Sequence, residues 1–301
     1  MIWTTELLER YKKSPKAFKR DVVLNEILED GGKFKEPFIN NRRAPGIKFK
    51  MTPEEAKEYT KQIEDITFLL SKTKFPPRDH QMDMLNDIKS NRNNIFVVSR
   101  QIGTSITSMF AALHYIINNS NRTVLILNPK SSGLSDSFYQ LLDVYDMLPY
   151  FIKPGITSSD VDQIEFENGS KIKFRTTKRT FGFGIDFLIL QDIAHNIDNE
   201  KIIKNIIPTV TASVNGKVLI YSTPNGHNEF YKFYKNSNFH KRKIPYTVFD
   251  IRNKTHEEFR KEKIMEMGGD DTAIMSFEQE YNCKFFNIEQ FKRNQRINSI
   301  I

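Results

Sequence analysis

Apolar and polar residues along the middle of the chain predict buried strands that alternate with helices. Short runs of β-branched and other apolar residues have the length of buried strands, and they cover residues 95–98, 123–128, 187–190 and 217–222. Apolar residues at helical spacing follow the first two runs, over Ser105 to Ile117 and Ser131 to Met147. Strands that alternate with helices predict an α/β fold with a mostly parallel central sheet flanked by helices.

Elements outside these runs are predicted from turns, caps and periodicity. Residues 164–174 alternate around Asn168-Gly169, which is a strong β-hairpin signal. The other predicted elements are a helix from Thr52 to about Leu70, a helix capped by Asp79, a strand from Lys243 to Phe249, and helices from Thr255 to Met267 and over residues 271–281.

The first predicted strand leads into a loop with the frame of a phosphate-binding loop. Residues 95–98 are followed by the run 99–105 (Ser-Arg-Gln-Ile-Gly-Thr-Ser) and then by a helix. In such a frame, backbone N–H groups and a helix N-terminus face an anion. The usual pattern ends in Gly-Lys-Ser/Thr, whereas Thr104 stands here in place of the lysine. Alone, the loop also fits a purely structural strand, turn and helix.

Two more polar loops follow predicted strands. Gln191 and Asp192 follow the strand 187–190, and the run 222–226 (Ser-Thr-Pro-Asn-Gly) ends the strand that begins at Lys217. Because ligands bind beyond the carboxyl ends of parallel strands, the three loops together favour a nucleotide site. Gln81 lies shortly before the first strand, and its amide both donates and accepts, as reading an adenine edge requires. Gln81 alone fits a solvated helix residue equally well.

Composition narrows the class of protein. A net charge of +8 and a pI near 9.3 are compatible with a nucleic-acid partner. No apolar run approaches the ~18 residues needed to span a bilayer, so we expect no membrane partner. The single cysteine, Cys283, excludes a disulfide framework within the chain and indicates a reducing compartment. The six histidines lack metal-ligand spacing, so no zinc site is expected.

Several motifs, in the same order along the chain, resemble the ATPase domain of the tailed-phage terminase large subunit, the DNA-packaging motor. The resemblance covers roughly residues 55–286, and the runs Ser-Arg-Gln-x-Gly and Ser-Thr-Pro-Asn-Gly together are fairly specific. The matching segments are residues 78–81 (adenine-reading motif), 99–103 (Walker A start), 187–194 (Walker B strand and acidic pair), 222–226 with Phe230 and Tyr231 (coupling motif), and 277–283 (closing segment).

The resemblance implies a role for each matching residue. It implies that ATP is bound by Gln81, Ser99, Gln101, Gly103, Thr104 and Ser105. It also implies that Asp192 and Arg100 are catalytic and that Ser105 and Gln191 hold Mg²⁺. Hydrolysis would be coupled to DNA movement by Ser222, Thr223, Pro224, Asn225 and Gly226.

The departures from the family pattern fall on the chemistry. Aligned on Ala194, the Walker B aspartate becomes Gln191 and the catalytic glutamate becomes Asp192. An alternative register makes Asp192 the Walker B aspartate and places Ile193 at the glutamate position. With Thr104 in place of the Walker A lysine, a charged hydrogen bond to phosphate worth roughly 1.5–3 kcal/mol is lost. We therefore expect weak or absent hydrolysis.

We expect an ATPase module that acts in packaging viral double-stranded DNA into procapsids in the host cytoplasm. The implied partners are double-stranded DNA, the portal and the small terminase subunit, with a homo-oligomeric ring only on the portal. Two alternatives stay open. One is a catalytically impaired pseudo-ATPase that serves as a packaging accessory or regulator. The other is an ATP-independent DNA-binding module that uses the basic segments at residues 10–20, 41–50 and 171–179.

Three regions are expected along the chain. Residues 1–50 form a basic and aromatic N-terminal extension, residues 51–240 form the P-loop ATPase-like core, and residues 241–301 form a C-terminal helical subdomain and tail. The family's nuclease domain is expected to be absent, because little sequence follows residue 286.

Overall fold

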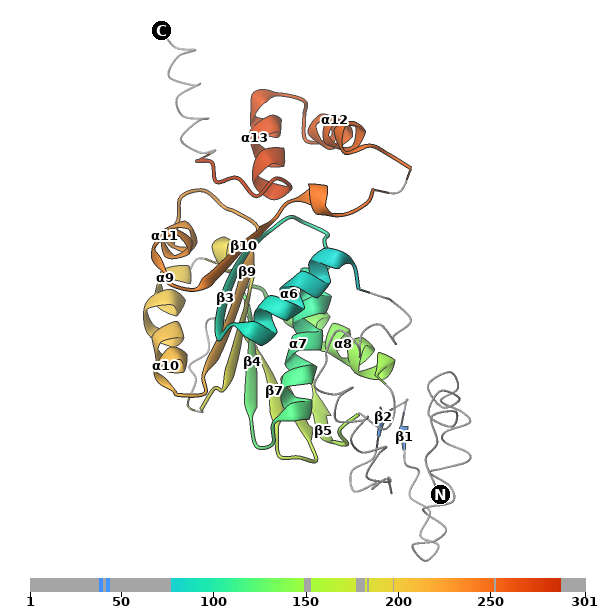
Figure 1. The fold of residues 1–301 in the computed structure, drawn as a ribbon, viewed down its shortest axis with the longest axis vertical. Helices are drawn as coiled ribbons and strands as arrows, with labels where there is room; N and C mark the ends of the chain where they lie inside the picture. The colour runs from blue at the N-terminus through green and yellow to red at the C-terminus, as the bar shows by residue number, and fades with distance from the viewer. Residues whose placement is uncertain are drawn as a thin grey trace, which may run out of the picture. The chain divides into compact units, whose positions relative to one another are not determined.

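The computed structural model describes residues 38–39, 42–43, 77–148, 153–176, 182, 184–196, 198–251 and 253–287 (Figure 1). The strands are β1 (Phe38–Ile39), β2 (Arg42–Arg43), β3 (Asn93–Val98), β4 (Thr123–Asn128), β5 (Ile156–Asp160), β6 (Gln163–Phe166), β7 (Lys171–Thr176), β8 (Phe187–Gln191), β9 (Lys217–Ser222) and β10 (His240–Ile244). The helices are α6 (Asp79–Ser90), α7 (Thr104–Asn118), α8 (Ser131–Met147), α9 (Asn199–Lys201), α10 (Ile207–Ala212), α11 (Glu229–Asn236), α12 (His256–Glu266) and α13 (Asp271–Glu280). Among the described helices, none is long and apolar enough to cross a membrane.

Strands β3 to β10 form one mixed sheet with the order β10-β3-β9-β8-β4-β7-β6-β5. The chain divides into two compact units, which we describe separately. Unit 1 contains residues 1–77, 106–125 and 134–174, and unit 2 contains residues 78–105, 126–133 and 175–301. A largely parallel sheet with helices between its strands confirms the fold class predicted from the sequence.

In unit 2, the strands β10, β3, β9 and β8 are parallel neighbours. All residues of β8 are buried, and so are all but the first of β3 and of β9. Parallel strands covered on both faces need such continuous apolar runs. Val97 lies opposite Ser222, and Gln191 lies opposite Tyr221. The three polar loops therefore start at the same edge of the sheet, as predicted.

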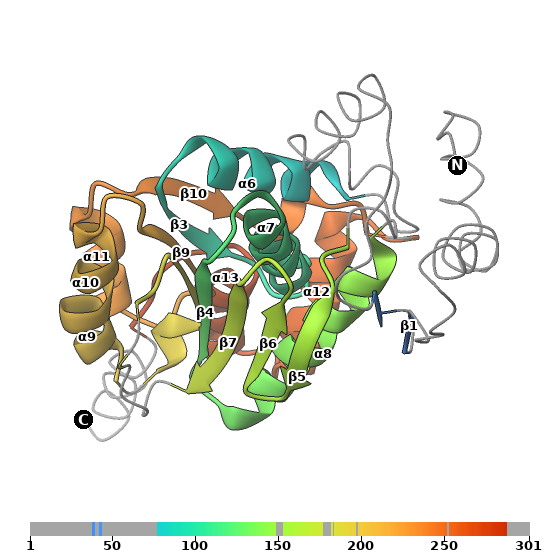
Figure 2. The same cartoon turned by 90° about the horizontal axis from the view of Figure 1, so that it is seen from below.

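Helices cover both faces of the unit 2 strands. Helix α6 packs on β3, and α10 packs on β8 and β9. Figure 2 shows α6 and the group α9 to α11 on opposite sides of these strands. Helix α6 buries His80, Met84, Leu85 and Ile88, which share one face of the helix. Because Gln81 lies in its first turn, α6 carries this residue to the edge where the loops begin.

The helices α12 and α13 enclose a small aromatic core that belongs to unit 2. Tyr246, Ile264, Ala273, Phe277 and Tyr281 are buried together there, and the Phe277 and Tyr281 rings stack with their centroids 5.0 Å apart. The Tyr246 N–H donates to the Tyr281 carbonyl at 2.8 Å. These contacts fix the end of α13 close to the chain that follows β10.

Unit 1 contains most of α7 and α8 and the antiparallel strands β5, β6 and β7. The predicted hairpin is confirmed: Gly169 adopts φ of 78° in its turn, a conformation that glycine adopts without strain. Asn168 Nδ2 donates to the Ile116 carbonyl at 2.7 Å and so ties the turn to α7. Phe138 of α8 packs edge-to-face on Phe174 of β7, with the ring centroids 5.7 Å apart.

Some sequence predictions were wrong at element boundaries. The strand predicted from Lys243 to Phe249 is instead β10, which ends at Ile244, followed by a 3₁₀ turn over Tyr246–Val248. Pro245 explains the difference, because proline has no N–H to donate to a neighbouring strand. The cap of α6 is Arg78 rather than Asp79. The predicted helix from Thr52 to Leu70 lies outside the described residues, and the three-region division along the chain stays a prediction.

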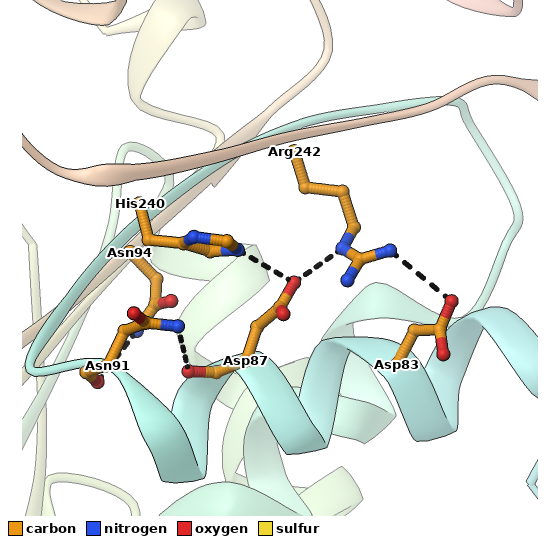
Figure 3. A network of polar contacts seen from close by, with 6 residues as sticks. All are labelled: Asp83, Asp87, Asn91, Asn94, His240 and Arg242. Carbon is orange, nitrogen blue, oxygen red and sulfur yellow. Dashed lines mark hydrogen bonds and ion pairs between the residues drawn. The ribbon is translucent and has the colours of Figure 1, made fainter.

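A charged network joins α6 to β10 (Figure 3). The Asp87 carboxylate receives a hydrogen bond from Arg242 Nε and lies 3.1 Å from His240 Nε2. Arg242 Nη1 also lies 3.2 Å from Asp83 Oδ2. Burial alone would raise the pKa of Asp87, but the hydrogen bonds and charges of Arg242 and His240 outweigh it and lower the pKa. The network stabilises the position of α6 beside β10.

Replacing Asp87 with asparagine is expected to lower the free energy of unfolding by about 1 kcal/mol at neutral pH, since it weakens a half-buried charged hydrogen bond. A carboxylate with a lowered pKa stabilises the fold above its unfolded-state pKa and loses that effect as the pH falls through its folded-state pKa. The difference between the two proteins should therefore disappear in acid. Urea unfolding at both pH values tests this.

The control for this prediction is Asp83→Asn, because Asp83 is exposed and binds the same arginine through a single contact. It is expected to change the free energy of unfolding by less than Asp87→Asn. An equal loss in the two variants, or a loss that persists in acid, would contradict the account.

Candidate nucleotide site

The loop between β3 and α7 has the backbone conformation of an anion-binding loop. Gln101 and Gly103 adopt left-handed angles, with φ of 61° and 82°, whereas Ile102 between them does not. Alternation of this kind turns successive N–H groups toward one side and forms a concavity that binds anions. The loop geometry therefore fits a phosphate group, and position 103 favours glycine because a side chain there would strain the backbone.

The first turn of α6 holds this loop in place. His80 Nε2 lies 2.8 Å from the Ile102 carbonyl, and Gln81 Nε2 donates to the Gly103 carbonyl at 3.2 Å. Gln81 Oε1 also accepts the Arg78 N–H at 3.0 Å. The structure therefore brings Gln81 and the phosphate loop together, as the sequence predicted. The adenine-reading role of Gln81 stays a prediction, because these contacts support the loop itself.

The residues at the ends of the loop are largely enclosed. Ser99 is buried, and its hydroxyl donates to the Arg100 carbonyl at 3.2 Å. Thr104 begins α7 and is 7% exposed, and its buried hydroxyl has no hydrogen-bond partner among the described residues. Ser105 follows it in the first turn of α7. A neutral residue therefore stands at the sequence position that the P-loop pattern gives to a lysine.

Gln191 is the last residue of β8, and Asp192 follows it at the sheet edge where the phosphate loop also begins. Gln191 is 3% exposed, and its Oε1 accepts from Asn128 Nδ2 at 2.9 Å. Asp192 has a left-handed backbone with φ of 48°, and its N–H donates to the Tyr221 carbonyl at 2.9 Å. Burial raises the pKa of Asp192, while the charges of His195, Arg100 and Lys130 partly oppose that shift. Asp192 is an exposed residue, and its carboxyl lies within range of these cationic charges.

The segment after Asp192 is joined directly to the loop 222–226. The Ala194 N–H donates to Ser222 Oγ at 3.2 Å, and the Ala194 carbonyl accepts from Asn225 Nδ2 at 3.1 Å. His195 Nε2 lies 2.7 Å from Thr223 Oγ1. Burial lowers the pKa of His195, partly opposed by Asp192. The predicted catalytic and coupling segments therefore form one hydrogen-bonded unit.

The last turn of α13 contacts both loops. Arg100 Nε and Nη2 lie 2.9 Å and 3.1 Å from the two carboxylate oxygens of Glu280, and the Arg100 N–H donates to the Glu280 carbonyl at 3.1 Å. The Gly226 N–H donates to Gln279 Oε1 at 3.0 Å. In this structure, Arg100 is bound to Glu280 rather than placed over the phosphate loop.

Sequence reasoning missed several residues of this site. Gln279 and Glu280 lie in the closing segment that the motifs matched, but no signal in the sequence indicated that they contact the loops, because these contacts form only on folding. Lys130 lies two residues after the last residue of a predicted strand, as Asp192 does, so the same strand-end rule would have found it. His195 stood in the predicted loop but was examined only as a metal ligand. The basic segments at residues 10–20 and 41–50 lie outside the described residues apart from Arg42 and Arg43.

Comparison with known proteins assigns the chain to a protein family. A family model described as "Terminase large subunit, T4likevirus-type, N-terminal" matches residues 95–295. The chain belongs to this family. The match extends over all three loops described above and over α12 and α13. It confirms the assignment to the terminase large subunit of the phage DNA-packaging machinery that the motifs predicted.

Solved structures share the fold of this terminase chain. The ATPase domain of the Thermus phage P74-26 large terminase is 20% identical with a TM-score of 0.53, covering 70% of this chain and 99% of that domain. The bacteriophage HK97 large terminase is 13% identical with a TM-score of 0.56, covering 74% of this chain and 55% of that protein. A large terminase of a thermophilic bacteriophage, in complex with ADP, is 13% identical with a TM-score of 0.50, covering 70% and 54%. This terminase chain therefore spans the whole ATPase domain but about half of the longer large terminases.

Proposed function

We propose that this terminase chain binds ATP at the three loops and uses its hydrolysis to move double-stranded DNA. The hydrogen bonds that join Ala194 to Ser222 and Asn225 support this proposal most strongly. They connect the segment that carries the candidate catalytic carboxyl to the candidate coupling loop without an intervening residue. A change at Asp192 on hydrolysis would reach the loop 222–226 within one or two residues.

The binding of a nucleotide fits the residues present. The left-handed angles at Gln101 and Gly103 shape the loop for phosphate, and Gln81 holds this loop through its hydrogen bond to the Gly103 carbonyl. A solved terminase of this fold is in complex with ADP. These observations support ATP as the ligand of Gln81 and residues 99–105.

The residues differ in how well they fit catalysis. Asp192, whose pKa is raised by burial, fits a base that orients or deprotonates the attacking water. Arg100 fits a charge-stabilising role once it leaves Glu280. Magnesium, when bound, would neutralise phosphate charge, and the Ser105 hydroxyl fits it as a ligand. Gln191 fits less well, since it is neutral and its oxygen already accepts from Asn128.

The same proposal covers the partners. As part of a packaging motor, the chain would act in the infected cell on double-stranded DNA, with the portal and the small terminase subunit. A ring of copies would form on the portal, where neighbouring subunits are held close together.

A second candidate function is a terminase module that binds ATP without turning it over. Two contacts favour it. The Gln191 oxygen that would face a magnesium-bound water already accepts a hydrogen bond from Asn128, and the Arg100 guanidinium already forms an ion pair with Glu280. Measurement of phosphate release in the presence of DNA and portal separates the two candidates, because only the first produces phosphate.

Nucleotide binding is the test common to both candidates. The unmodified chain is expected to bind ATP in isothermal titration calorimetry, with and without Mg²⁺. Gly103→Ala is expected to weaken binding by about tenfold, since strain at a left-handed position costs ~1–3 kcal/mol.

The control is Gly184→Ala. Gly184 has no left-handed backbone and an added Cβ there meets no atom within 4 Å, so this variant should bind ATP as the unmodified chain does. If the unmodified chain binds no ATP under any of these conditions, both candidate functions are wrong.

A further inference from the structure

In the proposed ATP site, the loop 99–105 has no cationic side chain that is free of an ion pair and could bind the phosphates. Thr104 replaces the lysine of the phosphate loop, and Arg100 is held by Glu280. Yet the β- and γ-phosphates of ATP carry several negative charges, and charge-assisted hydrogen bonds are the strongest contacts that a protein offers them. Another cation near the carboxyl ends of the strands would complete the site.

Lys130 lies near the carboxyl ends of the strands, where the proposed site is. It follows the last residue of β4, Asn128, and precedes the first residue of α8, Ser131. In the sheet, β4 is the neighbour of β8, which ends at Gln191. Asn128, Lys130 and Gln191 all belong to unit 2. Lys130 therefore occupies the carboxyl end of the strand next to the one that presents Asp192.

Hydrogen bonds fix this position. Asn128 Oδ1 accepts the Lys130 N–H at 3.0 Å, while Asn128 Nδ2 donates to Gln191 Oε1 at 2.9 Å. Asn128 is 8% exposed, and Gly133 lies so close that a Cβ there would meet Asn128 Oδ1 at 2.4 Å. The buried Asn128 side chain thus connects the backbone of Lys130 to the end of β8.

The charge of Lys130 already acts on the site. Its ammonium opposes the burial-induced rise in the pKa of Asp192 and adds to the lowering of the pKa of His195. The side chain is exposed, and within the described part of the chain its ammonium makes no ion pair. Arg100 acts on the same two groups but is bound to Glu280. Among the described residues whose charges act on Asp192, Lys130 is therefore a lysine that an incoming anion meets without first breaking an ion pair.

We propose that Lys130 binds the β- or γ-phosphate of ATP and takes the place of the lysine that the loop 99–105 lacks. This inference rests on the proposed ATP site. Its basis is the adjacency of β4 and β8, the Asn128 bridge, and an exposed ammonium whose charge reaches Asp192. A flexible lysine on a neighbouring strand end supplies a point charge to phosphate as a loop lysine does.

The test compares the binding of ATP, ADP and AMP to the full chain by isothermal titration calorimetry. Lys130→Ala is expected to weaken ATP binding by about ten- to a hundredfold, since a charged hydrogen bond to phosphate is lost. AMP binding should stay the same, because AMP lacks the β- and γ-phosphates. Lys130→Arg should keep most of the affinity for ATP.

The control is Lys89→Ala, which removes an exposed lysine from the last turn of α6 and should leave all three affinities unchanged. Unchanged ATP binding by Lys130→Ala overturns the inference while the proposed function stands. An equal loss for ATP and AMP, or an equal loss in Lys130→Arg and Lys130→Ala, also overturns it. If the unmodified chain binds no ATP, the inference and the proposed function fail together.

Discussion

Replacing Arg100 with alanine is expected to lower ATP turnover by about 10³-fold or more, because arginines that stabilise the transferring phosphoryl group contribute ~10³–10⁵ in rate. Arg100 is the cationic side chain of the phosphate loop, and its charge already acts on Asp192. ATP binding should change little, since the guanidinium is bound to Glu280 before turnover. Phosphate release with DNA and portal, measured beside ATP affinity, tests both statements.

Glu280→Gln is the matched control for Arg100→Ala. Both variants break the same ion pair, but only one removes the guanidinium. The pair is partly exposed, with the Arg100 side chain 51% accessible, so its loss alone is worth about 1 kcal/mol or less. Glu280→Gln should therefore keep turnover or raise it by up to about fivefold. If it loses as much activity as Arg100→Ala, Arg100 acts as a structural anchor for α13 rather than on phosphate.

Replacing Gln191 with aspartate is expected to raise Mg²⁺-dependent ATP turnover by about ten- to a hundredfold, the equivalent of one charged interaction of ~1.5–3 kcal/mol. Asn128 Nδ2, which donates to the glutamine oxygen, remains as a hydrogen-bond donor near the shorter carboxylate. The Mg²⁺ concentration needed for half-maximal turnover should fall as well, because the new side chain adds a negative charge near the metal. Titration of turnover with Mg²⁺ measures both effects.

Gln191→Asn separates charge from side-chain length, since asparagine and aspartate have the same size. The asparagine variant is expected to show no gain in turnover and no fall in the Mg²⁺ requirement. A similar gain in both variants would mean that Gln191 obstructs the site by its length. No gain in either would show that the Walker B position does not limit this chain.

The central strands and helices could be predicted because burial leaves a strong pattern in the sequence. The buried residues of β3, β8 and β9 form unbroken apolar runs, and β4 and α8 begin and end at the predicted residues. The three polar loops were predicted for the same reason, since parallel strands place their carboxyl ends together. The hydrophobic pattern located these loops, and the family motifs then indicated which role each loop has in the terminase family.

Contacts between distant segments could not be predicted in the same way. Arg100 and Glu280 are 180 positions apart, and neither residue carries a local signal for the other. The helices α9 to α11 are short and were missed, because a few turns give too little periodicity to recognise. The β10 boundary was wrong because apolar residues after Pro245 resembled a strand, although proline interrupts the ladder. A single sequence therefore predicts which residues are buried better than it predicts which distant residues contact each other.

Helix α13 touches the phosphate loop and the coupling loop through adjacent residues, Glu280 and Gln279. Displacement of its last turn would therefore release both loops at once. Thermodynamic linkage is reciprocal. A ligand that weakens the contact between this turn and Arg100 is itself bound more tightly, by the same factor, once that contact is broken. If the chain acts in the proposed motor, a partner that pulls on α13 would thus act on the phosphate loop and on the coupling loop at the same time.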